Sequence, residues 1–231
     1  VVAIFGSVIK FSGTIMLDKY RYVKHVLSDA DMKMASSDLM AQYMPPMVKA
    51  LAQRIEDDLM NLFPLFTGSN GTFNTTLTEP DIRDCREDLL DGSADLDLPV
   101  YGVIHQHAEN DLLSIARLTE EDKAPGFGAA LSRAFIGTRF GIEWFVRQGV
   151  PRASGTNIAN RVFQRNAIAL VQRPLGTTDA PGVSMSESMD NDFSIRFWTA
   201  WDSDRGGVAI VGDVLYGVKI LRDPLGIRLL N

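Results

Sequence analysis

Apolar and polar residues alternate near both ends of the chain, as they do in β-strands that are buried on one face. Residues 1–27 show this alternation between short Gly and Ser-Gly breaks, so we expect a hairpin or an extended arm there. Residues 193–230 are rich in β-type residues, with breaks at residues 202–207 and 222–226. This closing stretch therefore predicts strands that are joined by turns.

A helical period follows the first stretch. Ser28 and Asp31 resemble a capping box at the start of a helix. Apolar residues then recur every three or four positions from Leu39 to Leu62, which is typical of an amphipathic helix. Pro45-Pro46 interrupts this period. Because proline cannot donate a backbone hydrogen bond and clashes with the preceding turn, we expect a kink or two abutting helices.

The centre of the chain mixes helical and strand patterns. The expected elements are a turn at 68–71, a helix that begins at Thr78-Glu79-Pro80, a strand at 98–104, a helix at 109–118, and strands at 134–150 that bend near Gly137 and Gly141. Ile82, Cys85 and Leu89 fall on one face of the first of these helices. The order of elements predicts an α+β protein with one discontinuous domain and no repeats.

Composition limits the class of protein. At 231 residues the chain can bury one sizeable core or two modest ones. A hydrophobic fraction of 45% and a charged fraction of 23% are ordinary for a globular protein. The formal net charge of -6 excludes a basic field over the whole protein that could wrap nucleic acid.

Cysteine content and the chain start narrow the picture further. Cys85 is the single cysteine, so an intrachain disulfide is excluded and a reducing compartment is favoured. No apolar run approaches the roughly 18 residues of a membrane-spanning helix. The first residues hold no initiator Met, basic leader or cleavage site, which predicts a processed chain or further residues upstream.

Candidate chemistry is sparse. His105 and His107 lie two residues apart with Glu109 and Asp111 close behind, which permits a metal site or a polar strand-to-helix turn. The turn is favoured because no second cluster with metal-ligand spacing occurs. Cys85 falls on an apolar helix face and is expected in the core. The sequence therefore predicts no catalytic, cofactor-binding or metal-ligating residue.

Two further patterns do not fit binding sites. Asp91, Asp95 and Asp97 do not have the spacing of a calcium loop, with its glycine at the sixth position and its distal Glu. Gly126-x-Gly128 lacks the third glycine of a dinucleotide loop. Trp198 and Trp201 lie on one predicted strand, on opposite or staggered faces. We expect one of them in the core and the other as a contact residue.

Four segments, in order, resemble the major capsid proteins of tailed double-stranded-DNA bacteriophages, which share the Johnson fold. The segments are Thr14 to Met60, with Leu17-Asp18-Lys19 and Ile55-Glu56-Asp57-Asp58; Leu98 to Leu118; Ala134 to Pro151; and Asn166-Ala167-Ile168-Ala169 followed by Ile195 to Val218. Together they cover about half of the chain. The prolines within the long helix depart from the family pattern, and Lys10, Lys19 and Lys24 have no assignable partner for an intersubunit cross-link.

The resemblance implies an α+β fold with a long spine helix, an extended loop and two domains. Residues 1–27 are expected to be part of the extended loop and to lie across a neighbour. Residues 28–78 and 161–216 are expected to form the peripheral domain with long antiparallel strands, and residues 79–160 and 217–231 the axial, mixed α/β domain. Pro45-Pro46 and residues 68–71 are candidate hinges.

The resemblance also implies a function. The chain is expected to be a structural protein without enzyme activity that self-assembles as pentamers and hexamers into an icosahedral shell around double-stranded DNA. Expected partners are copies of itself, a portal, scaffolding or decoration proteins, and DNA without sequence-specific contacts, with no membrane. The expected location is the virion, after assembly in the host cytoplasm. The alternatives are an encapsulin-like compartment shell and a soluble metalloenzyme that uses His105 and His107.

Overall fold

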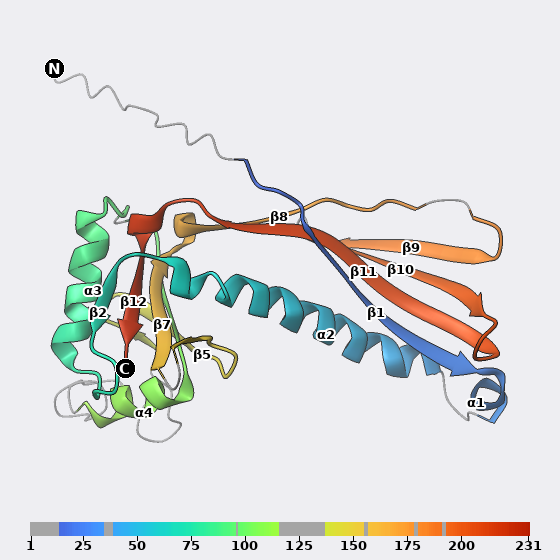
Figure 1. Cartoon of the computed structure of the whole chain (residues 1–231), viewed down its shortest axis with the longest axis horizontal. Coiled ribbons are helices and arrows are strands. Elements are labelled where there is room, and N and C mark those ends of the chain that lie inside the picture. Colours follow the sequence, from blue (N-terminus) through green and yellow to red (C-terminus); the bar gives the residue numbers. More distant parts are fainter. Residues whose placement is uncertain are drawn as a thin grey trace, which may run out of the picture.

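The described part of the chain contains two β-sheets, and a long helix extends along the first sheet to the second (Figure 1). The computed structural model describes residues 14–34, 39–95, 97–115, 137–154, 157–177, 180–190 and 193–231. The expectations for residues 1–13 and for Gly126-x-Gly128 lie outside these ranges. In the described ranges, no helix combines the length and the apolar character needed to cross a membrane.

The first sheet has five antiparallel strands. Their order is β1-β11-β10-β9, and β8 pairs with the last residues of β11. The strands are β1 (Lys19–Ser28), β8 (Ile168–Gln172), β9 (Val183–Asp190), β10 (Phe193–Asp202) and β11 (Gly207–Ile220). The expected strands of the closing stretch are confirmed, and the turn at residues 203–206 separates β10 from β11.

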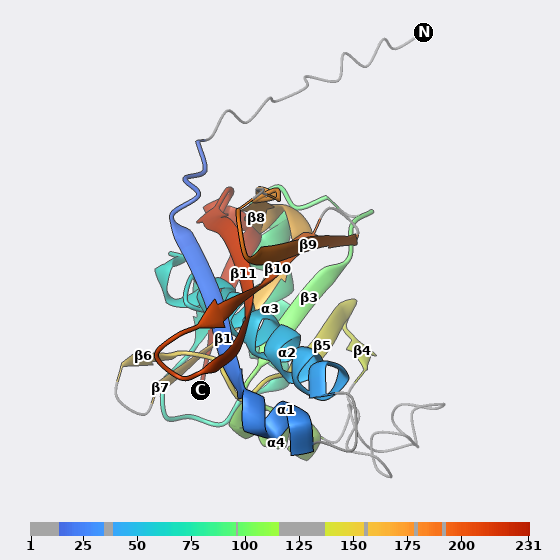
Figure 2. The same ribbon diagram turned by 90° about the vertical axis from the view of Figure 1, so that its right-hand side faces the viewer.

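One face of this sheet is covered by the long helix α2 (Leu39–Met60), which follows the short helix α1 (Asp29–Met34). Figures 1 and 2 both show α2 alongside β1 and β11. Leu51 and Ile55 of α2 pack against Val214 and Tyr216 of β11 in one buried cluster. Apolar residues spaced by one helical turn thus meet alternate residues of a strand, as the two periodicities require.

The prolines do not divide the long helix, so the alternative of two abutting helices is wrong. α2 runs continuously through Pro45 and Pro46, which are both exposed. Each proline lacks the backbone N–H of a helical hydrogen bond, and α2 continues without these two bonds. Ser28 caps α1 instead of α2, since its Oγ accepts a 3.2 Å hydrogen bond from the Asp31 amide.

The second sheet has seven mixed strands in the order β2-β12-β7-β3-β5-β4, and β6 pairs with β7. The strands are β2 (Ser69–Gly71), β3 (Val100–Ile104), β4 (Thr138–Arg139), β5 (Ile142–Val146), β6 (Arg152–Ser154), β7 (Asn157–Gln164) and β12 (Gly226–Leu230). The expected bend at Gly141 is confirmed, because this glycine adopts a φ of 73° between β4 and β5.

Helices α3 (Glu79–Asp91) and α4 (Gln106–Ser114) contribute to the core on one face of the second sheet. Ile82, Cys85 and Leu89 of α3 are buried there, as predicted. Thr78 and Asp81 form a capping box at the start of α3. The other face meets the end of α2 and the short 3-10 helix η1 (Phe63–Leu65). Two further 3-10 turns, η2 (Arg165–Ala167) and η3 (Asp223–Leu225), lead into β8 and β12.

Three expected elements differ from the structure. Residues 69–71 form β2, parallel to β12, where a turn was expected. A Cβ at Gly68 would collide with Ile227, so the glycine permits close strand approach. α4 begins at Gln106, because the His105 side chain caps it. Residues 19–27 were expected in the arm, but they pair with β11 of the same chain.

Two sheet boundaries also differ from the expected division into domains. Residues 161–164 were expected with the peripheral strands, but they belong to β7 of the seven-stranded sheet, next to β3 and β12. Residues 217–220 were expected with the axial strands, but they belong to β11 of the five-stranded sheet, where they pair with β8.

Candidate assembly surface

β1 is an edge strand, and two buried carboxylates hold it from opposite faces of the sheet. The first is Asp58 of α2, whose Oδ2 accepts a 2.6 Å hydrogen bond from the Tyr216 hydroxyl and a 3.2 Å bond from Arg21. Lys19 and Arg54 lie 4.0 Å and 3.8 Å from the same carboxylate. Asp58 therefore joins β1, α2 and β11 at one point.

The charge state of Asp58 follows from these contacts. Burial alone would raise its pKa, but hydrogen bonds from Tyr216 and Arg21 and the charge of Lys19 outweigh burial and hold the pKa below its usual value. Burial and the bond to Asp58 raise the pKa of Tyr216 to about 12, so it stays a neutral donor. The carboxylate is therefore ionised at neutral pH.

The second carboxylate, Asp213 of β11, is almost fully buried. Its oxygens accept hydrogen bonds of 2.9 Å and 2.6 Å from the Arg196 guanidinium and 2.7 Å from the Tyr20 hydroxyl, and Trp198 donates at 3.3 Å. A two-point contact from Arg combines charge with fixed geometry. Asp213 thus fastens β1 and β10 to the central strand β11.

We predict that Asp58→Asn weakens the fold in a pH-dependent way. Because the folded pKa lies below the unfolded value of about 3.9, the ionised group stabilises the fold above that pH, and the contribution is lost as the pH falls through the folded value. Urea unfolding at pH 7 is expected to show a deficit of about 1.5–3 kcal/mol in the variant. The difference from wild type should shrink below about pH 4; a difference that grows on acidification contradicts the prediction.

Large apolar side chains remain exposed on both faces of the five-stranded sheet. Tyr20, Tyr22 and Met189 lie on the face away from α2, and Tyr22 is 64% exposed. Trp201 lies on the other face, at the far end of β10, and is 57% exposed. Trp198 is half-buried on the face of Asp213, so the two tryptophans lie on opposite faces as predicted, but neither is in the core. Exposed aromatic side chains of this kind are typical of contact surfaces.

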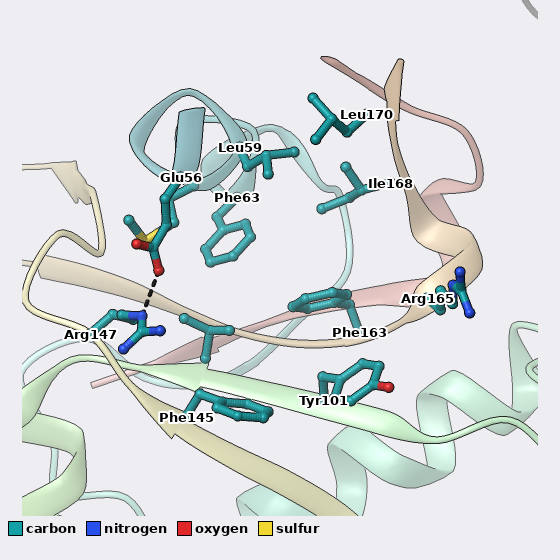
Figure 3. A pocket seen from close by; sticks show the side chains of 12 residues that line it. Glu56, Leu59, Phe63, Tyr101, Phe145, Arg147, Phe163, Arg165, Ile168 and Leu170 are labelled. Carbon is teal, nitrogen blue, oxygen red and sulfur yellow. Dashed lines mark hydrogen bonds and ion pairs between the residues drawn. The ribbon is translucent and has the colours of Figure 1, made fainter. Parts of the chain in front are cut away.

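A pocket of about 360 Å³ lies where α2 ends against the seven-stranded sheet (Figure 3). Most of its lining is apolar, from Leu59, Met60, Phe63, Tyr101, Val103, Phe145, Phe163, Ile168 and Leu170. Glu56 and Arg147 form an ion pair across it, and Arg165 stands at one side. No sequence pattern indicated this pocket, because its walls come from four separate parts of the chain.

Arg161 of β7 is a charged side chain inside the protein. Its guanidinium lies 4.3 Å from the Phe66 ring centre and 5.7 Å from that of Phe63, and its nitrogens have no hydrogen-bond partner among the described residues. Burial, and then the nearby charge of Arg228, lowers its pKa to about 9. The aromatic faces compensate only part of the cost of removing this cation from water.

The histidines occupy a helix start. The His105 side chain accepts a 3.3 Å hydrogen bond from the His107 amide, and the two rings stack with centres 5.1 Å apart. Within the described residues, no group of three His, Cys, Asp or Glu side chains is placed to hold a metal ion. Cys85 is buried as expected, and burial raises the pKa of its thiol to about 12.

Comparison with known proteins identifies the fold. The sequence matches no protein-family model and no curated protein. The structure is similar to that of Mycobacterium phage Che8, with a TM-score of 0.66 and 17% identity over 93% of this chain and 71% of the other. The capsid structure of cyanophage P-SCSP1u gives a TM-score of 0.63 and 17% identity over 99% and 79%.

An encapsulin structure is similar as well. The holo-SrpI encapsulin complex from Synechococcus elongatus PCC 7942 gives a TM-score of 0.59 and 13% identity over 91% of this chain and 72% of the other. The chain therefore has the α+β phage major capsid fold, the Johnson fold, as the sequence resemblance implied.

Proposed function

We propose that this chain is a major capsid protein, which assembles as pentamers and hexamers into an icosahedral shell around double-stranded DNA. The observation that carries the proposal is the likeness to the P-SCSP1u capsid structure, which extends over 99% of the chain. Its role is structural, and its principal partner is a second copy of itself. Its location is the virion, with assembly in the host cytoplasm.

The two sheets correspond to the two parts of a shell subunit in this proposal. The seven-stranded sheet with α3 and α4 is the axial part, which meets its copies around the five-fold and six-fold axes. The five-stranded sheet with α2 is the peripheral part, and the exposed Tyr22 and Trp201 support its contact with neighbours. Portal, scaffolding and decoration proteins are further partners of such a shell, and the DNA is enclosed without sequence-specific contacts.

The test is assembly of the purified full chain. Negative-stain microscopy and sedimentation velocity are expected to show closed shells or capsomer-sized rings. A chain that remains monomeric up to high protein concentration contradicts the proposal.

An encapsulin-like shell is the second candidate, which the likeness to the SrpI encapsulin favours. Particles isolated from the cells in which the protein occurs separate the two. Nuclease-resistant double-stranded DNA inside them supports a capsid, and an enzyme cargo without such DNA supports a compartment.

We predict that Trp201→Ala reduces assembly without unfolding the protein. Because Trp201 is 57% exposed, its removal leaves little buried surface uncovered, and the unfolding temperature should stay unchanged. Interface tryptophans often contribute 2 kcal/mol or more, so particle yield is expected to fall about tenfold or more. The matched control is Trp198→Ala, which removes a bond to Asp213 and should lower the unfolding temperature. Unchanged particle yield from Trp201→Ala excludes this contact.

A further inference from the structure

The pocket beside α2 is open at an apolar mouth. Phe145 and Leu170, on two of its sides, are 40% and 39% exposed. The rings of Tyr101, Phe145 and Phe163 lie along its floor in Figure 3. A hollow with such walls is unfavourable in water and favours an apolar side chain that fills it.

The charges around the pocket are unequal. Glu56 is paired with Arg147, so these two side chains contribute no net charge. Arg165 is exposed, and no carboxylate pairs with it among the described residues. The rim is therefore positive, and it complements an apolar group that is flanked by carboxylates.

The outer side of α3 has this complementary character. Asp84, Glu87 and Asp91 are exposed and recur at spacings of three and four residues, which places them along one ridge of the helix. Within the described part of the chain, none of the three has a cationic partner. Leu90, directly beside Glu87 on the helix surface, is 41% exposed.

The two surfaces lie on opposite faces of the seven-stranded sheet. Ile104, Ile142 and Val162 point into the core under α3. Val103 and Phe163, one residue along the same strands, point into the pocket. Because successive residues of a strand face opposite ways, one copy cannot place its own α3 in its own pocket.

We propose that α3 of one copy docks on this pocket of the next copy, with Leu90 entering the apolar mouth and Glu87 meeting Arg165. A contact between opposite faces of one domain is heterologous, and repetition of such a contact closes a ring when the rotation fits. The inference rests on the proposed shell function and specifies which surfaces join neighbours within a capsomer.

Charge reversal in the full chain tests the pairing. Arg165→Glu places like charges together and is expected to lower the yield of rings and particles about tenfold or more, measured by sedimentation velocity. Adding Glu87→Arg to the same chain restores opposite charges and should recover most of the yield. The control is Arg173→Glu, an exposed arginine outside the pocket, which should assemble normally. The pairing is wrong if Arg165→Glu behaves like the control, or if the double variant assembles no better than Arg165→Glu.

Disulfide trapping tests the contact independently of charge. Chains with Leu90→Cys and chains with Leu170→Cys are mixed under oxidising conditions, and a dimer that requires both chains is expected. The native Cys85 stays unreactive, because it is buried and its pKa is raised to about 12. If the wild-type chain assembles but the two cysteine variants form no mixed dimer, this contact alone is wrong. The contact is also wrong if the Leu90→Cys chain forms a disulfide dimer without the Leu170→Cys chain. A wild-type chain that never associates overturns the proposed function instead.

Discussion

Replacing Asp213 with Ala is expected to lower the free energy of unfolding by about 3–5 kcal/mol, because its partner side chains would stay in the interior without an acceptor. Arg196 would keep a largely buried charge without its two-point acceptor, and the hydroxyl of Tyr20 would lose its bond. Because Asp213 links β1, β10 and β11, the loss should affect the whole five-stranded sheet. Guanidinium unfolding at neutral pH, followed by circular dichroism, measures the effect.

Asp202→Ala is the matched control for this variant. Asp202 lies at the end of β10 in the same sheet, and it pairs with Lys24 through a 2.6 Å contact at the surface. Water screens that pair, so its removal should change stability far less than the removal of Asp213. Equal losses in the two variants would show that the buried network contributes no more than a surface ion pair.

Arg161→Met is expected to stabilise the protein, by about 1–4 kcal/mol, because an apolar side chain of similar length replaces a buried charge. The Arg161 nitrogens have no described hydrogen-bond partner, so the change removes no such bond. The sulfur of Met can keep favourable contact with the rings of Phe63 and Phe66. Thermal unfolding of the two chains at neutral pH measures the difference.

Arg228→Met is the control with the opposite expected sign. Arg228 of β12 lies opposite Arg161 of β7 in the antiparallel strand pair. Its guanidinium donates hydrogen bonds to the carbonyl oxygens of Thr67 and Gly68. Loss of these bonds should cost about 1 kcal/mol. If Arg161→Met destabilises the protein as Arg228→Met does, an ordered solvent or ion partner of Arg161 is the better explanation.

Apolar spacing and capping residues were enough to predict helix α3. The core face of α3 follows from the spacing of Ile82, Cys85 and Leu89, and the helix start follows from Thr78. Residues 69–71 were assigned wrongly because glycine suits both turns and close strand contacts, and only the tertiary position of β12 separates the two. The continuity of α2 through Pro45 and Pro46 was not predicted, because proline in a helix interior usually disrupts the helix.

The candidate surfaces were beyond the reach of local patterns. Tyr216 and Asp58 are 158 residues apart in the sequence, and no spacing rule connects them. A signal for the other network was present, since Asp213 is the one charged residue in the apolar run from Val208 to Val218, and an isolated charge in such a run indicates a buried partner. The resemblance to phage capsid proteins supplied the fold because it combined all segments in order.

The pairing of β1 with β11 also sets the order of events during synthesis. Every residue of β1 pairs with β11, and the bond from Tyr20 to Asp213 spans 193 residues. At a translation rate of about 5–20 residues per second, β1 and α2 wait roughly ten to forty seconds for this strand. The five-stranded sheet is completed only when β11, which ends at Ile220, has emerged. Nascent chains therefore lack a finished subunit surface, and the architecture separates translation from association with other copies in time.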